Sequence, residues 1–220
     1  MNSGVNLITH GDIPTWVYEA ARALMQSLKI VDPLTFYHCC RVGELSRKLA
    51  RDMSLTEYEQ KLAEFSGLFH DVGKIVVPQS IIHKPAKLDP EEYDIMKKHP
   101  EFSEEIVRSL AHSEFFSNLI PAVRHHHERV DGRGYPDGLN GDQIPLLSRV
   151  ILVADTYDAM THTRSYRKGM NVDAVYAELL RCQGTQFDPH IAKVFLEAHP
   201  KWEAELTDSE TEDKILKKVV

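Results

Sequence analysis

The chain has 220 residues, 42% of them hydrophobic and 27% charged, so it can bury a full core and its length suits one domain. This composition excludes a disordered chain, a collagen and a coiled-coil rod. The net charge of −7, from 26 basic and 33 acidic side chains, excludes a protein whose whole surface binds polymeric nucleic acid or anionic lipid.

Signals for membrane insertion, export and disulfides are missing from the sequence. No apolar run reaches the roughly 18 residues of a membrane span, and the opening residues have no basic stretch followed by an apolar one. Two of the 3 cysteines, Cys39 and Cys40, are adjacent, so no disulfide framework is expected. We therefore expect a cytoplasmic protein with no membrane partner.

Helix patterns dominate the first part of the chain. Apolar residues recur with helical spacing over residues 12–29, and again after Pro33. A third helix is expected from Thr56, which forms a capping box with Glu59, and it should run into the pair at residues 70–71. The apolar stripe of residues 12–29 can pack on its own domain or pair with a second copy in a homodimer.

Shorter helices are expected in the middle of the chain. Asp89 and Pro90 mark one start, and that helix should stop near His99, because Pro100 restricts the residue before it. Two more short helices are expected over residues 101–110 and 114–127.

A long loop over residues 131–144 follows, with four glycines and one proline. Loops of this length are often functional. The apolar run 150–154 suits a buried strand or a helix, and we prefer a helix because the apolar period continues to Met160. The last helices are expected over residues 172–182 and after Asp188-Pro189.

The predicted fold is therefore all-α, a single compact multi-helix domain with a long glycine-rich active-site loop. Residues 1–30 form an N-terminal helical segment, residues 31–199 the main domain and residues 200–220 a charged C-terminal tail. Acids gather in that tail, since residues 201–213 carry six of them against one lysine.

Side chains that ligate metals recur at six places: His38, His70-Asp71, His99, the triplet His125 to His127, Asp155 and Asp158. Imidazoles and carboxylates suit iron, manganese or zinc in a reactive site, whereas structural zinc usually takes several cysteines. A carboxylate such as Asp71 can bridge two cations, and a water between them becomes hydroxide near neutral pH and attacks phosphorus. A single histidine such as His38 is more often an ordinary hydrogen-bonded residue, so the joint occurrence carries the prediction.

Six motifs follow one another between residues 32 and 198. They are His38-x-x-Arg41-Val42, Leu68-Phe69-His70-Asp71-Val72-Gly73-Lys74-Ile75, Lys84-Pro85-Ala86-Lys87-Leu88 leading to Met96-x-x-His99-Pro100, His126-His127-Glu128-x-x-Asp131-Gly132-x-Gly134-Tyr135-Pro136-Asp137-Gly138, Val153-Ala154-Asp155-x-x-Asp158-Ala159-Met160-Thr161, and Gly184-Thr185-x-Phe187-Asp188-Pro189. In this order they resemble the HD-GYP domains, a branch of the HD phosphohydrolase superfamily that hydrolyses the bacterial second messenger cyclic di-GMP.

The resemblance implies a role for each of these residues. The implied metal ligands are His38, His70, Asp71, His99, His126, His127 and Asp155, with Asp71 bridging two ions. Asp71 and Lys74 are the implied catalytic residues, and Lys74 also reaches a phosphate of the substrate. The implied substrate-binding residues are Lys74, Tyr135, Asp158, Arg164 and Arg167. Asp158 would also orient other groups near the site, Tyr135 would bond near Asp158 or face a guanine, and His125 would lie outside the ligand set.

Two positions depart from the family pattern. Leu34 stands where many members have a Glu, one turn before the first histidine, that helps hold a third metal. We therefore expect two divalent metal ions, iron first and manganese or zinc as alternatives. Ser165 stands where the family commonly has Pro, which puts the phosphate-clamping turn of Arg164 and Arg167 in doubt.

The sequence thus predicts a metal-dependent phosphodiesterase that opens cyclic di-GMP to linear pGpG and, in a second step, yields GMP. Two alternatives stay open. One is a catalytically weak receptor or interaction module for cyclic di-GMP, and the other is a phosphohydrolase of another cyclic dinucleotide. The resemblance also implies a diguanylate cyclase as a partner.

Overall fold

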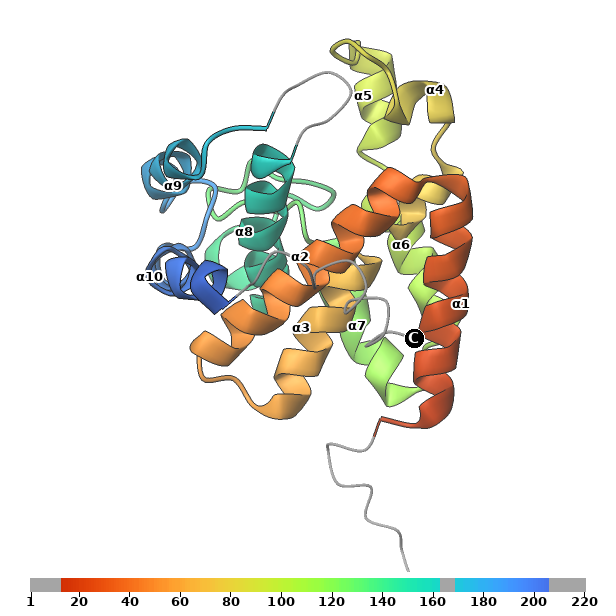
Figure 1. Cartoon of the computed structure of the whole chain (residues 1–220). Coiled ribbons are helices and arrows are strands. Elements are labelled where there is room, and N and C mark those ends of the chain that lie inside the picture. Colours follow the sequence, from red (N-terminus) through yellow and green to blue (C-terminus); the bar gives the residue numbers. More distant parts are fainter. Residues whose placement is uncertain (1–12, 163–168, 206–220) are drawn as a thin grey trace, which may run out of the picture.

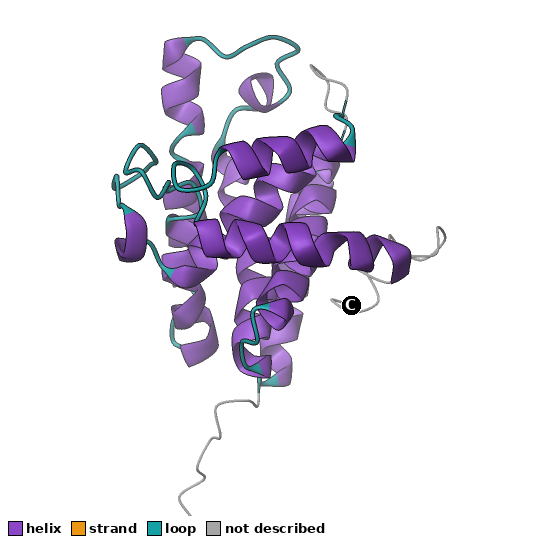
Figure 2. Ribbon diagram, turned by 90° about the vertical axis from the view of Figure 1, so that its left-hand side faces the viewer, coloured by secondary structure: helices purple, strands orange, loops and turns teal. Residues whose placement is uncertain are grey.

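The computed structural model describes residues 13–162 and 169–205, and within them the chain forms helices and loops but no strand (Figures 1 and 2). This confirms the predicted all-α fold. The helices are α1 (Thr15–Val31), α2 (Pro33–Asp52), α3 (Glu57–Phe69), the 3₁₀-helix η1 (Val72–Val76), α4 (Gln79–Ile82), α5 (Pro90–Met96), α6 (His99–Arg108), α7 (Glu114–Arg124), the 3₁₀-helix η2 (Gly141–Gln143), α8 (Leu146–Thr161), α9 (Val172–Arg181) and α10 (Pro189–Glu205). No helix of the described part is long and apolar enough to span a bilayer.

The starts of the helices follow the capping signals of the sequence. The Asp32 carboxylate accepts the backbone N–H groups of Leu34 and Thr35 and so caps α2. Capping boxes form at Thr56, before α3, and at Asp89, before α5. Each cap satisfies N–H groups that have no partner inside the helix, which stabilises a helix by about 1 kcal/mol.

The chain departs from the prediction where it leaves α3. This helix ends at Phe69 and the chain continues as η1, which packs closely on α6 at Gly73. A Cβ on Gly73 would lie 2.3 Å from the carbonyl oxygen of His99. The Gly73 N–H donates to Ser103 Oγ at 2.8 Å. This contact fixes residues 70–71 against the start of α6.

Two helix boundaries near the expected site also differ. The segment predicted over residues 101–110 begins earlier, at His99, because Pro100 is tolerated in a first turn whose N–H groups need no intrahelical acceptor. The segment predicted to end at residue 127 ends at Arg124. There the Glu128 N–H closes a turn on the carbonyl of His125 at 3.0 Å. The histidine triplet therefore lies in a turn after α7.

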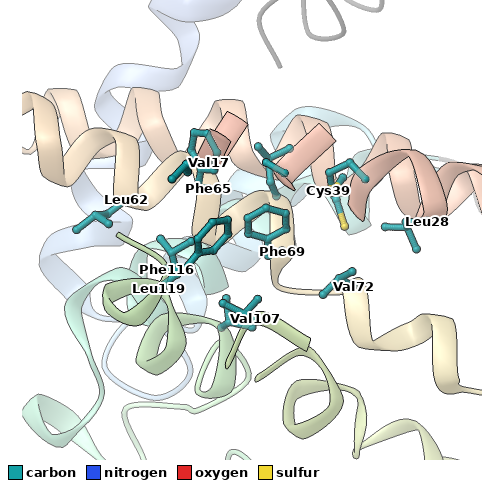
Figure 3. Close-up of a cluster of buried hydrophobic side chains, with 14 of the residues drawn as sticks. Val17, Leu28, Cys39, Leu62, Phe65, Phe69, Val72, Val107, Phe116 and Leu119 are labelled. Carbon is teal, nitrogen blue, oxygen red and sulfur yellow. The ribbon is translucent and has the colours of Figure 1, made fainter. Parts of the chain in front are cut away.

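The first hydrophobic cluster joins α1, α2, α3 and α7 (Figure 3). Phe69 and Phe116 are fully buried at its centre, and each contributes about 2–3 kcal/mol through the apolar area it removes from water. The buried face of α1 consists of Val17, Ala21, Met25 and Leu28. The apolar stripe of α1 is thus used within its own domain, which favours this interpretation over pairing with a second copy.

A second cluster joins α8, α9 and α10 on the side of the molecule opposite α1 (Figure 1). Between the two clusters, α2 and α3 cross closely because both carry a glycine at the crossing. A Cβ on Gly67 would lie 2.8 Å from the Cα of Gly43. This close approach brings His38 of α2 and His70 after α3 together, with ring centroids 5.2 Å apart. The metal-type side chains therefore gather between the two clusters.

Candidate metal centre

The seven predicted metal ligands converge from five segments that are far apart in the sequence. His38 comes from α2, His70 and Asp71 follow α3, His99 opens α6, His126 and His127 follow α7, and Asp155 lies on α8. Their ligand atoms form two groups, Asp71 with His99, His126 and His127, and His38 with His70 and Asp155. Within each group these atoms lie no more than 4.8 Å apart. The structure therefore brings all seven residues together, and their role as metal ligands stays a prediction.

Asp71 joins the two groups through its two carboxylate oxygens. Oδ1 lies 3.0 Å from Nε2 of His99 and 4.0 Å from Nε2 of His126. Oδ2 lies 3.3 Å from Nε2 of His70 and 3.6 Å from Nε2 of His38. One carboxylate oxygen faces each group, which is the arrangement that a bridging ligand requires.

Three histidines of the site present their Nε2 atoms to its centre because their Nδ1 atoms are bonded to backbone carbonyls. The Nδ1–H of His70 donates to the carbonyl oxygen of Gly67 at 2.7 Å, and the Nδ1–H of His99 donates to the carbonyl oxygen of Met96 at 2.8 Å. His126 does the same with Val123 at 2.6 Å. Since a carbonyl can only accept, Nδ1 carries the proton and Nε2 has a free lone pair. Such bonds orient metal-ligating histidines.

Several acceptor atoms of the site have no hydrogen-bond donor. Among the described residues, Nε2 of His38, Nε2 of His70 and Oδ1 of Asp71 are buried without a hydrogen-bond partner. Nε2 of His99 and Nε2 of His126 lie 3.1 Å apart, although both are acceptors by the argument above. Buried acceptors that converge without donors are costly unless a cation binds them. The donor set therefore fits divalent metal ions.

The protonation states favour the same conclusion. Burial lowers the pKa of His127 to about 3, and it also lowers the pKa values of His99 and His126. Burial would raise the pKa of Asp71, but the positive charge of Lys74 outweighs it and holds this pKa well below its ordinary value. These imidazoles are neutral and the carboxylate is charged at neutral pH, as metal ligation requires.

His38 differs because a side chain orients it. Its Nδ1 donates to Oδ2 of Asp158 at 2.6 Å, and burial, which lowers the pKa of His38, is outweighed by its hydrogen bonds to Asp155 and Asp158. Asp158 is only 1% exposed. It also accepts from Nε and Nη2 of Arg41 at 2.6 and 3.0 Å. These contacts fit the orienting role expected for Asp158, and burial leaves it little surface for substrate.

Arg41 also belongs to this arrangement, although its motif His38-x-x-Arg41 predicts no role for it. It follows His38 by three positions in α2, so both side chains lie on one helix face and reach the same carboxylate. The spacing of three residues between His38 and Arg41 was the sign in the sequence that Arg41 lies near the site. The partner, Asp158, is too distant in sequence for the spacing to reveal.

Lys74 and Tyr135 flank the group of ligands. Nζ of Lys74, on η1, lies 2.5 Å from Oδ2 of Asp71. The ring of Tyr135 stacks on His127, with centroids 4.8 Å apart and planes 27° from parallel. Burial raises the pKa of Tyr135, so its hydroxyl stays protonated. Tyr135 was expected to bond near Asp158 or to face a guanine, and its ring contact is with His127.

The other predicted positions differ in how far the structure describes them. Leu34 is 64% exposed in the first turn of α2, and its side chain cannot ligate a metal. Cys39 lies near His70 and Asp71, but burial raises the pKa of its thiol well above the usual value, so it is a poor ligand. His125 bonds to Asp137 instead of the ligands. Arg164, Ser165 and Arg167 lie outside the described residues.

Comparisons with known proteins agree with this geometry. A family model described as "HD domain" matches residues 22–191. A cyclic di-GMP phosphodiesterase of Pseudomonas aeruginosa is 39% identical over 172 residues, which cover 78% of this chain and 41% of the relative. The cyclic di-GMP phosphodiesterase response regulator of Xanthomonas campestris is 34% identical over 185 residues, covering 84% of this chain and 49% of the relative. The chain thus spans less than half the length of these relatives.

Solved structures show the same fold. A cyclic GMP-AMP-specific phosphodiesterase of Vibrio cholerae superposes with a TM-score of 0.67 at 18% identity, over 91% of this chain and 53% of that one. An HDG"Y"P protein of Bdellovibrio bacteriovorus superposes with a TM-score of 0.62 at 18% identity, over 84% and 63% of the two chains. The matched family model and the relatives show that the chain belongs to the HD domain family, within its HD-GYP group, and the convergence of the seven predicted ligands agrees with this.

Proposed function

We propose that the chain is a metal-dependent phosphodiesterase that hydrolyses cyclic di-GMP to linear pGpG and, in a second step, to GMP. The observation that carries this proposal is Asp71, whose two oxygens face two separate groups of imidazoles. Relatives with more than a third of their aligned residues identical are named cyclic di-GMP phosphodiesterases. A substrate made inside the cell would require the site to face the cytoplasm.

Two divalent ions would be held by the seven ligands, with Asp71 shared between them; iron is our first choice, followed by manganese and zinc. When bound, such ions activate water and neutralise the charge of a phosphate. Leu34 supports two ions instead of three, because the position that would add a carboxylate is apolar. Elemental analysis of metal per chain tests this number, and a ratio near three would contradict it.

The protein's own side chains bind and orient the substrate. Lys74 donates to Asp71, and its ammonium is close enough to the predicted ligands to contact a phosphate held there. Arg41 and Asp158 keep the ring of His38 in position. Tyr135 offers a ring edge and a protonated hydroxyl beside His127. Arg164 and Arg167 would clamp phosphate oxygens bidentately.

The test is turnover of cyclic di-GMP by the metal-loaded chain, with pGpG and GMP separated by chromatography. We expect product from the wild type and none from Asp71→Asn. The absence of product over hours, while an established relative digests the same substrate, would overturn the proposal. Tight binding without product would favour the receptor, for which a diguanylate cyclase would be a partner.

A second substrate is favoured by a specific observation. Relatives from Vibrio cholerae that are 38% and 36% identical are named 3'3'-cGAMP-specific phosphodiesterases. A competition between equal amounts of cyclic di-GMP and 3'3'-cGAMP distinguishes the two proposals, because the preferred dinucleotide disappears first.

A further inference from the structure

The loop that carries Tyr135 is tied to the turn that carries two metal ligands. This Gly-Tyr-Pro loop comprises residues 131–140, whose ends pair through an isolated antiparallel bridge between Asp131 and Asn140. Near the start of the loop, the Tyr135 N–H donates to the carbonyl of His127 at 3.3 Å. A side chain at Gly134 would prevent this approach, since its Cβ would lie 2.5 Å from the Cα of Glu128.

The second half of the loop is held by a buried carboxylate. Glu128, directly after His127, is 1% exposed. Its Oε1 accepts the backbone N–H of Asp137 at 2.7 Å and that of Gly138 at 3.0 Å. Hydrogen bonds to a charged acceptor are stronger than those between neutral groups. No metal or substrate role has been assigned above to this residue.

The side chain of Asp137 is held from the same turn. Nε and Nη2 of Arg124 each lie 2.8 Å from one of its carboxylate oxygens, and Nε2 of His125 lies 2.8 Å from Oδ2. Arg124 in turn pairs with Glu104 of α6. The backbone and the side chain of one loop residue are thus both bound by the residues that flank His126 and His127.

We propose that Glu128 is a positioning residue that holds the Gly-Tyr-Pro loop, and with it the ring of Tyr135, over His127. The bonds from Glu128 fix the loop after Tyr135, while the His127 carbonyl fixes it at Tyr135. Glu128 acts through Tyr135 on substrate affinity and does not contact the metal ligands' Nε2 atoms. The effect on affinity rests on the proposed function, whereas the effect on the loop does not.

Limited digestion with trypsin tests the loop directly, because Arg133 is exposed within it. We expect the Arg133–Gly134 bond of Glu128→Ala to be cut about ten times faster than that of the wild type, since its closed state has lost two charge-assisted hydrogen bonds. Glu128→Gln keeps an oxygen acceptor and should stay within about twofold of the wild type. Glu105→Ala removes an exposed acid of α6 and serves as the control. Cleavage of Glu128→Ala at the wild-type rate would overturn the proposal.

A second variant covers the case in which Glu128→Ala does not fold. Glu128→Asp keeps the charge but withdraws the carboxylate by one methylene, so the two N–H groups lose their acceptor. Faster cleavage at Arg133 in this variant, with an unchanged circular dichroism spectrum, supports the proposal. Wild-type cleavage of a folded Glu128→Asp contradicts it.

Kinetics with cyclic di-GMP then separate positioning from metal support. We expect Glu128→Asp to raise KM about tenfold while kcat and the metal content per chain stay within twofold. A loss of metal with unchanged KM would overturn the proposal, because Glu128 would then support the ligands. If the wild type does not turn over cyclic di-GMP, the proposed function fails, and the digestion still decides the role of Glu128.

Discussion

The two halves of the metal centre are held in different ways. On one side of Asp71, His99 and His126 each donate to a carbonyl three residues earlier in their own turn. On the other side, the Gly67 carbonyl holds His70 in the same way, but His38 donates to Asp158, which lies 120 residues later on α8. The first kind of support exists once a local turn has formed. The second exists only after α8 has packed against α2, so the His38 half depends more on tertiary structure.

The largest effect on metal binding and turnover is expected at Asp71, which faces both halves. Asp71→Asn replaces the carboxylate that faces both groups, so both should lose metal. Loss of several kcal/mol of charge stabilisation corresponds to a decrease in turnover of about 1,000-fold or more. Metal per chain and kcat are measured together, with the exposed Asp173→Asn as the control. Loss of metal from one half alone would contradict the proposal that both metal ions share Asp71.

A smaller effect is expected when only the His38 half is weakened. Asp158→Asn leaves the carbonyl-supported histidines unchanged but removes the charged acceptor of His38 and Arg41. Metal affinity should fall about 10- to 100-fold, as it does when second-shell partners of ligating histidines are removed. Titration with a chelator measures the affinity of each site. Equal weakening of both sites would show that the halves are not independently supported.

The two halves should also differ in how they change the free energy of unfolding of the metal-free protein with pH. His127, with a pKa of about 3, stays neutral in the folded chain while the unfolded chain takes up a proton below about pH 6.5. The unfolded state then binds more protons, so the free energy of unfolding falls as the pH drops, by about 1.4 kcal/mol per pH unit for each such histidine.

His38 adds nothing to this slope below pH 6.5, because its raised pKa keeps it protonated in both states there. Its stabilising contribution is lost instead as the pH rises through its folded pKa. Urea unfolding in the presence of a chelator at pH 7, 6 and 5 measures the slope. His127→Gln should reduce it, and a wild-type free energy that is constant over this range would contradict the burial argument.

The smallest effect is expected at Leu34, which precedes His38 by one turn. Because Leu34 is 64% exposed, Leu34→Glu should change the free energy of unfolding by less than about 0.5 kcal/mol. We expect the added carboxylate to raise the metal content by one ion per chain on the His38 side. Leu34→Gln, which adds no charge, is the matched control. An unchanged metal content in Leu34→Glu would show that more than this side chain is missing.

Local signals in the sequence determined the framework of this protein. Caps at Thr56 and Asp89 begin their helices as predicted, because a cap acts within one turn. The motifs also indicated the seven side chains that the structure brings together. The Ile151 region became a helix, as its apolar period required.

Tertiary structure decided the rest, because it depends on contacts between residues far apart in the chain. The segment after Phe69 packs on α6 through Gly73, which donates to Ser103 thirty residues later. The division of the ligands into two groups, and the pairing of Arg41 with Asp158, require α2, α6 and α8 to be in place. Residue types and spacing predict which side chains bind metal, but only the packed helices show which atoms face one another.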